Sequence, residues 1–136
     1  MSTSVDARNS LTVCTVSSNA QFLADYLKTA TGKDFAIEAG TEGKNAIVLT
    51  LGTANENPES YQLKVAGDGI TITGPTEAGV FYGIQSLRKS LPVAVGADIS
   101  MPAVEINDAP RFGYRGAHFD TSRHFFTVDE IKTYID

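Results

Sequence analysis

The sequence predicts an α+β fold in which a mostly antiparallel sheet carries two helices on one of its faces. Short runs of alternating polarity are interspersed with two amphipathic segments, in the order strand, helix, four strands, helix, strand. Residues 61–65 and 70–73 alternate in polarity on either side of Asp68-Gly69, which predicts a β-hairpin. Each predicted helix has a single apolar stripe, so each can cover one face of a sheet.

The composition indicates a globular domain with a core of its own. The chain has 136 residues, of which 42% are hydrophobic and 20% charged. A net charge of −5 argues against nucleic acid or an anionic membrane surface as a partner. We also expect no membrane span, because no run of about 18 apolar residues occurs.

The single cysteine, Cys14, lies in an alternating apolar run and is predicted to be a buried core residue. One cysteine allows neither an internal disulfide nor a cysteine-based metal cluster. The two histidines have no partner at ligand spacing, so we predict no metal site and no cofactor.

The first half of the chain supplies a strand, a helix and two further strands. Residues 11–16 alternate in polarity, and residues 17–19 offer N-cap oxygens to the helix that follows. Gly32 lies where a C-cap glycine belongs. Residues 35–39 form a short strand candidate, whereas Ala46–Leu51 is almost wholly apolar and is therefore predicted to be central. The apolar stripe of the helix consists of Phe22, Leu23, Tyr26, Leu27 and Ala30.

A second helix is predicted to begin after Thr76, its candidate N-cap, and to stop at Pro92. Gly79 and Gly83 lie inside it, where each costs about 1 kcal/mol relative to alanine. We interpret them as sites where the helix backbone closely approaches a strand. A phosphate-binding loop is the alternative, but the glycines fall within the amphipathic pattern. The stripe consists of Val80, Ile84, Leu87 and Leu91.

The C-terminal segment has the pattern of one β/α unit. After a last strand at residues 104–108, Pro110 is predicted to end the first domain. Residues 114–120 are strand-like, a polar loop with Arg123 and His124 follows, and Val128–Ile135 is helix-like. Because one such unit cannot bury its own faces, we expect it to be the front of a larger fold.

Two stretches resemble a known family. TEAGVFYGIQSLR, at residues 76–88, resembles the second helix of the small N-terminal domain of glycoside hydrolase family 20, the β-N-acetylhexosaminidases. INDAPRFGYRGAHFDTSRHFF, at residues 106–126, is similar to that family's passage into its catalytic barrel. The resemblance implies an N-terminal α+β domain at residues 1–109. Residues 110–136 would then be the linker and the first strand and helix start of a truncated (β/α)8 barrel.

The resemblance also implies an activity for the parent protein. The family hydrolyses terminal β-linked N-acetylglucosamine or N-acetylgalactosamine with retention, and the substrate's own 2-acetamido oxygen is the nucleophile. An Asp-Glu pair later in the barrel assists. Here the only such pair after the barrel start is Asp129-Glu130, which we interpret as acidic residues at a helix start. We therefore expect no catalytic residue in this chain and no glycosidase activity of the chain alone. Its implied partners are a glycan with a terminal N-acetylhexosamine and the missing catalytic barrel.

One site residue is implied by the resemblance. Arg123 matches the arginine of the family's Asp-x-Ser-Arg-His motif, which binds hydroxyls of the terminal sugar. Its guanidinium fork suits paired hydroxyl acceptors. Asp120 and His124 are interpreted as supporting residues that hold the loop or line the site. The alternative for Arg123 is a structural ion pair with Asp120, and Arg115 is interpreted as structural.

A stand-alone carbohydrate- or protein-binding module is the rival hypothesis. It would need an exposed aromatic platform, and the chain has no tryptophan. A different barrel hydrolase with a similar front domain is a third possibility, distinguished only by residues downstream. The family resemblance implies export to the periplasm, cell surface or medium, although no leader opens this sequence.

Overall fold

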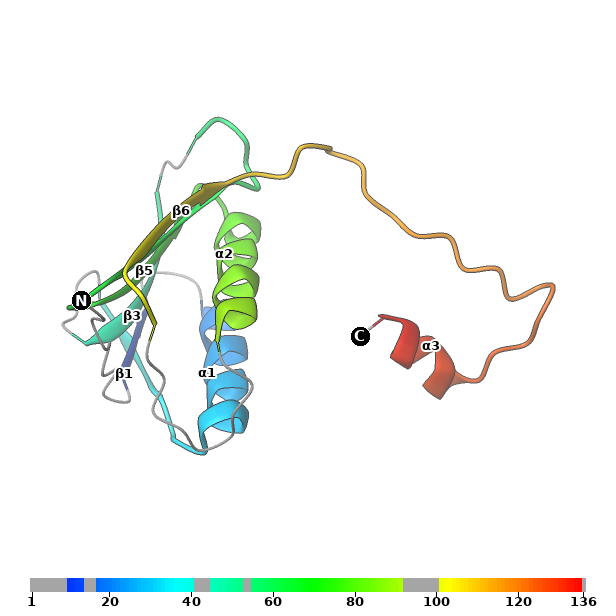
Figure 1. Cartoon of the computed structure of the whole chain (residues 1–136), viewed down its shortest axis with the longest axis horizontal. Helices are drawn as coiled ribbons and strands as arrows, with labels where there is room; N and C mark the ends of the chain where they lie inside the picture. The colour runs from blue at the N-terminus through cyan, green and yellow to red at the C-terminus, as the bar shows by residue number, and fades with distance from the viewer. Residues whose placement is uncertain (1–9, 14–16, 41–44, 53–54, 92–100, 136) are drawn as a thin grey trace.

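A computed structural model describes residues 10–13, 17–40, 45–52, 55–91 and 101–135. Its elements follow the predicted order, and a sheet carries two helices, α1 and α2, on one face (Figure 1). The elements are β1 (Ser10–Val13), α1 (Ser17–Thr31), β2 (Ala36–Ala39), β3 (Ala46–Leu51), β4 (Tyr61–Ala66), β5 (Gly69–Gly74), α2 (Glu77–Ser90), β6 (Val104–Asp108) and α3 (Val128–Ile135). Cys14 lies outside the described residues.

The sheet is mixed, so the prediction of a mostly antiparallel sheet is wrong. The strand order is β2-β1-β3-β5-β4-β6, and β3 is central, as predicted. The β1–β2, β1–β3 and β3–β5 pairs are parallel, whereas β4–β5 and β4–β6 are antiparallel. The predicted hairpin forms, but its second strand, β5, lies between β3 and β4. Because β4 reverses the chain direction, β5 returns parallel to β3.

The core fills the space between the sheet and the two helices. Along β4 the burial alternates, with Tyr61, Leu63 and Val65 buried toward the helices. The helix α2 contributes the stripe that its periodicity predicts. The predicted stripe of α1 is confirmed only in part, because Leu23 and Leu27 are buried whereas Phe22 is exposed, and Ala20 and Ala24 reach the core in its place. The fully buried large side chains are Leu23, Leu49, Leu63, Ile72, Val80, Ile84 and Leu87.

The two glycines of α2 allow the close approach that the sequence predicts. A Cβ on Gly79 would overlap the carbonyl oxygen of Ser60, which precedes β4. A Cβ on Gly83 would overlap a methyl group of Ile72 in β5 and crowd the ring of Tyr61. The helix backbone therefore rests directly on β4 and β5, and both positions exclude any larger residue in this packing.

The helix ends are capped largely as predicted. The Thr76 hydroxyl accepts a hydrogen bond from the backbone N–H of Gly79 at 3.3 Å. Gly32 has the left-handed backbone, with φ of 72°, that a C-terminal cap requires. Asn19 is not a cap, because α1 has already begun. Its side-chain amide instead donates to the backbone oxygen of Glu77 at 2.9 Å, which joins the start of α2 to α1.

The C-terminal segment leaves the domain on the side of the helices (Figure 1). The structure has no strand at residues 114–120, in contrast to the prediction, and these residues run as unpaired extended chain. A strand is stabilised by hydrogen bonds to a neighbour, and none of the described strands pairs with this stretch. The predicted helix is confirmed as α3, none of whose residues is buried.

Candidate functional site

Arg123 and Asp120 come together as an ion pair. Arg123 Nε lies 2.9 Å from Asp120 Oδ2, and the Arg123 side chain is 90% exposed. The other carboxylate oxygen of Asp120 accepts the backbone N–H of Ser122 at 2.9 Å, which closes the turn between them. The pair corresponds to the structural alternative for Arg123. The sugar-binding role implied by the family motif stays a prediction.

His124 is not brought into this pair. Its ring packs edge-on against Phe126, with centroids 4.9 Å apart. Phe119 contacts both Phe126, at 4.7 Å between centroids, and Tyr134 of α3, at 4.8 Å. These rings pack α3 against the extended segment that precedes it, and His124 lies at the margin of this aromatic cluster.

Asp129 and Glu130 lie in the first turn of α3, as predicted for structural acidic residues. Glu130 Oε2 accepts the backbone N–H of Thr127 at 2.7 Å and its hydroxyl at 2.9 Å, while Thr127 Oγ1 accepts the N–H of Glu130 at 3.4 Å. This is a reciprocal capping box. The hydrogen bonds from Thr127 lower the pKa of Glu130. Glu130 therefore stabilises a helix start.

Arg115 anchors the C-terminal segment to the α+β domain. Its two terminal nitrogens contact both carboxylate oxygens of Glu59, at 2.8 and 3.1 Å, and one of them also donates to the Tyr82 hydroxyl at 2.8 Å. The bidentate hydrogen bond from Arg115 is the main cause of a lowered pKa for Glu59, and the same bond raises the pKa of Arg115. Arg115 was predicted to be structural. Its partners, 56 and 33 residues upstream, were not predicted.

A second polar cluster joins β4, α2 and β6. The Tyr61 hydroxyl lies 2.5 Å from the Ser86 hydroxyl and donates to Asp108 Oδ2 at 3.2 Å. Burial raises the pKa of Tyr61. A hollow of about 200 Å³ opens beside this cluster, and Lys89 and Pro110 are among the residues that line it. The cluster lies where the chain leaves the sheet.

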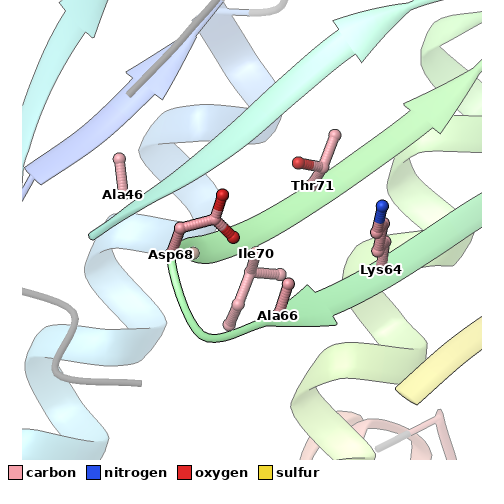
Figure 2. A pocket seen from close by; sticks show the side chains of 7 residues that line it. Ala46, Lys64, Ala66, Asp68, Ile70 and Thr71 are labelled. Carbon is pink, nitrogen blue, oxygen red and sulfur yellow. The ribbon is translucent and has the colours of Figure 1, made fainter. Parts of the chain in front are cut away.

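A smaller hollow, of about 120 Å³, lies at the β4–β5 turn beside the start of β3 (Figure 2). Lys64 and Asp68 are its charged lining residues, and both are exposed. Within the described part of the chain, no group of three or more His, Cys, Asp or Glu side chains could hold a metal ion. None of the described helices combines the length and apolar character needed to cross a membrane.

The fold and these contacts define a small α+β domain whose polar clusters join its own elements and fix the segment that follows. A model of glycosyl hydrolase family 20, domain 2, matches residues 3–109. The chain therefore belongs to this domain family, in agreement with the resemblance noted in the sequence.

Relatives and solved structures agree with this assignment. A beta-hexosaminidase of Porphyromonas gingivalis is 39% identical over 125 residues, which cover 86% of this chain and 16% of the relative. A beta-N-acetylhexosaminidase of Cellulomonas fimi is 31% identical over 82% of this chain and 23% of its own length. A mutant Streptomyces plicatus beta-hexosaminidase, solved in complex with the product GlcNAc, matches with a TM-score of 0.79 and 32% identity, over 98% of this chain and 28% of that chain. The chain thus spans between 16% and 28% of the length of these relatives.

Proposed function

We propose that this chain is the N-terminal, non-catalytic domain of a β-N-acetylhexosaminidase, followed by the start of its catalytic barrel. The parent enzyme would hydrolyse terminal β-linked N-acetylglucosamine or N-acetylgalactosamine by a retaining mechanism in which the substrate's 2-acetamido oxygen is the nucleophile. Residues 114–120 would become the first barrel strand once neighbouring strands pair with them. Export of the parent protein is part of the same proposal.

The family match over residues 3–109 is the observation on which this proposal rests. The Asp129-Glu130 pair supports inactivity of the chain alone, because Glu130 is engaged in capping α3. A (β/α)8 barrel needs about 250 residues, far more than the segment after residue 109 supplies. Catalysis would therefore depend on groups that follow Asp136 in a longer protein.

Arg123 would bind the sugar in the complete enzyme. Its guanidinium is exposed and makes one ion pair through Nε, which leaves its two terminal nitrogens free of other described contacts. Asp120 would hold that guanidinium in place while the terminal nitrogens donate to sugar hydroxyls. His124 would line the same loop without contacting the reacting bond.

The test is release of an aryl leaving group from an aryl β-N-acetylglucosaminide. We expect activity from the full reading frame and none from residues 1–136. In the full-length protein, Arg123→Ala should lower kcat/KM by about 100-fold or more, because hydrogen bonds to a charged group contribute about 1.5–3 kcal/mol each. Arg111→Ala is the matched control, since Arg111 is an exposed arginine of the same segment, stacked on Phe112 at 5.4 Å.

Three outcomes would contradict the proposal. Activity of residues 1–136 alone would place the chemistry in this chain. Equal activity of the Arg123→Ala and Arg111→Ala enzymes would remove the sugar-binding role. Full-length protein without activity, combined with glycan affinity of the 136-residue chain, would favour the carbohydrate-binding module.

A further inference from the structure

The hollow at the β4–β5 turn follows from the register of three strands. Ala66 of β4 and Ala46 of β3 both pair with Gly69 of β5, so one row across the sheet consists of three small residues. Residues two apart on a strand share a face, and the next row on this face contains the longer side chains of Lys64 and Thr71. The surface is therefore lower at the row of small residues, where the hollow of about 120 Å³ lies (Figure 2).

The backbone that forms the hollow is held in place. A Cβ on Gly69 would lie 2.6 Å from the carbonyl oxygen of Ala46, and the φ of 152° at Gly69 also favours glycine. The backbone oxygen of Asp68 accepts the N–H of Asn45 at 2.5 Å, which ties the turn to the start of β3. The side chains around the hollow therefore start from fixed backbone positions, which lowers the entropy cost of ordering them around a ligand.

Three polar side chains surround the hollow without partners of their own. Figure 2 shows the Asp68 and Lys64 side chains on two sides of it, with Thr71 between them. Among the residues that the structure describes, none of these three side chains forms a hydrogen bond or an ion pair. In contrast, Lys28 and Asp34 elsewhere in the domain form an ion pair at 2.6 Å. The hollow thus offers a cation, an anion and a hydroxyl group to a ligand.

The nearest acidic residue on the sheet does not neutralise Lys64. Glu105 pairs with Lys64 across β4 and β6, so the two side chains lie on the same face. However, Glu105 Oε1 accepts the side-chain amide of Gln62 at 3.0 Å and that of Asn107 at 3.4 Å. These amides hold the carboxylate at the β6 margin, and the Lys64 ammonium is left to the hollow.

The chemistry of these side chains selects a ligand that carries both charges. A neutral ligand would displace water from the Lys64 ammonium and the Asp68 carboxylate without supplying a charge in its place. A simple anion or cation would neutralise only one of the two. The volume corresponds to about four water molecules at about 30 Å³ each, which is room for an ammonium group, one carbon atom and a carboxylate.

We infer that the hollow binds the α-ammonium and α-carboxylate groups of an amino acid. Lys64 pairs with the carboxylate of the ligand, to which the Thr71 hydroxyl also donates a hydrogen bond, and the Asp68 carboxylate accepts hydrogen bonds from the ligand's ammonium group. Because Lys64 and Asp68 are exposed, the affinity should be weak, with a Kd in the millimolar range.

The position of this site leaves it accessible in the described structure. Residues 63, 65, 70 and 72 of the hairpin are buried against the helices, and the residues of the hollow alternate with them on the opposite face of the sheet. The chain beyond β6 leaves the domain on the side of the helices and does not cover the hollow (Figure 1). Binding of an amino acid here does not depend on the glycosidase activity proposed for the parent protein.

Nuclear magnetic resonance of the 15N-labelled 136-residue chain tests the site with L-alanine as the probe. The backbone amide signals of Asp68, Gly69 and Thr71 should shift saturably as L-alanine is added. Acetate and ethylammonium carry only one of the two charges, and at equal ionic strength each should bind about tenfold more weakly or worse. N-acetylglucosamine, which is neutral, should leave these signals unchanged.

Two variants assign each charge of the ligand to its partner. In the Asp68→Asn protein L-alanine should bind no better than acetate, because the ammonium group has lost its acceptor charge. In the Lys64→Gln protein L-alanine should bind no better than ethylammonium. Both side chains are exposed, so neither change disturbs the core. Lys89→Gln is the matched control, since Lys89 is an exposed lysine of α2, and its affinity for L-alanine should equal that of the wild type.

Four results would overturn the inference. The first is the absence of a saturable shift at about 100 mM L-alanine, well above a millimolar Kd. The second is acetate that binds as tightly as L-alanine, which would reduce the site to an exposed lysine that attracts anions. Equal shifts with N-acetylglucosamine would assign the hollow to a neutral sugar. Unchanged affinity in both Asp68→Asn and Lys64→Gln would place the bound amino acid elsewhere on the domain.

Discussion

Replacing Gly79 by alanine should destabilise the domain, although helix propensity alone predicts the opposite. A Cβ at this position would overlap the carbonyl oxygen of Ser60 and lie 3.3 Å from Pro75 Cδ. Ser60 is completely buried, and its oxygen is a main-chain atom that cannot rotate away. Relief therefore requires α2 to move off β4, where Val80 packs in the core.

The magnitude follows from two opposed effects. Alanine in place of a helical glycine contributes up to about 1 kcal/mol of stability. Overpacking a well-packed contact costs about 1–3 kcal/mol, and the upper part of this range applies where backbone must shift. We therefore expect Gly79→Ala to lower the free energy of unfolding by about 1–2 kcal/mol.

Urea denaturation followed by far-UV circular dichroism measures this difference. With an m value of about 2 kcal/mol/M, within the usual range for urea, the midpoint should fall by about 0.5–1 M. Ala78→Gly is the matched control, because Ala78 is the exposed neighbour in the same turn of α2 and its change should cost about 1 kcal/mol through propensity alone. Both substitutions should thus destabilise. A Gly79→Ala protein more stable than the wild type would refute close approach of the backbones as the reason for this glycine.

Two further predictions concern the core and α3. Leu49→Ala should cost about 2–5 kcal/mol in urea denaturation because Leu49 is fully buried in the central strand, whereas Leu51→Ala, at the exposed end of the same strand, should cost much less; equal effects would contradict the assigned core. Because hydrogen bonds from Thr127 lower the pKa of Glu130, the stabilisation of α3 should be complete above the ordinary glutamate pKa of 4.5 and be lost as the pH falls through the lower folded value. The backbone chemical shifts of Val128–Ile135, measured by nuclear magnetic resonance as the pH is lowered, would show this loss of helix. Glu130→Gln should remove the pH dependence. The same pH transition in the Glu130→Gln protein would contradict the prediction.

The sequence predicts the strands of the sheet and the three helices well, since each is encoded locally, whereas the strand predicted at residues 114–120 needs a neighbouring strand and does not form. The alternation of residues 61–65 and the stripe of α2 are periodicities that only one kind of element can bury efficiently. The pairing of strands within the sheet, in contrast, is not encoded locally. The alternating residues of β5 would look the same whether β5 paired with β3, with β4 or with both, so the parallel β3–β5 contact was not predictable from the pattern.

The contacts of the C-terminal segment differ in whether a local sequence pattern predicts them. Nothing near Arg115 indicates that its partner is Glu59, because the two lie 56 residues apart in the sequence, with the hairpin, α2 and β6 between them. The capping box of α3 was readable, since Thr127 and Glu130 have the required Thr-x-x-Glu spacing. Arg123 was identified through the family motif, and its pairing with Asp120 was one of the two alternatives considered.

The two margins of the sheet differ in how they can meet other polypeptides. On the described strands, β2 forms one margin and β6 the other. The unpaired backbone groups of a marginal strand are a template for strand addition and aggregation, which charged side chains discourage. Each margin exposes one large apolar side chain, Ile37 in β2 and Val104 in β6, but β6 carries two acidic residues, Glu105 and Asp108, whereas β2 carries only Glu38. Repulsion therefore protects the β6 margin better, and intermolecular assembly of this domain at high concentration should start at β2.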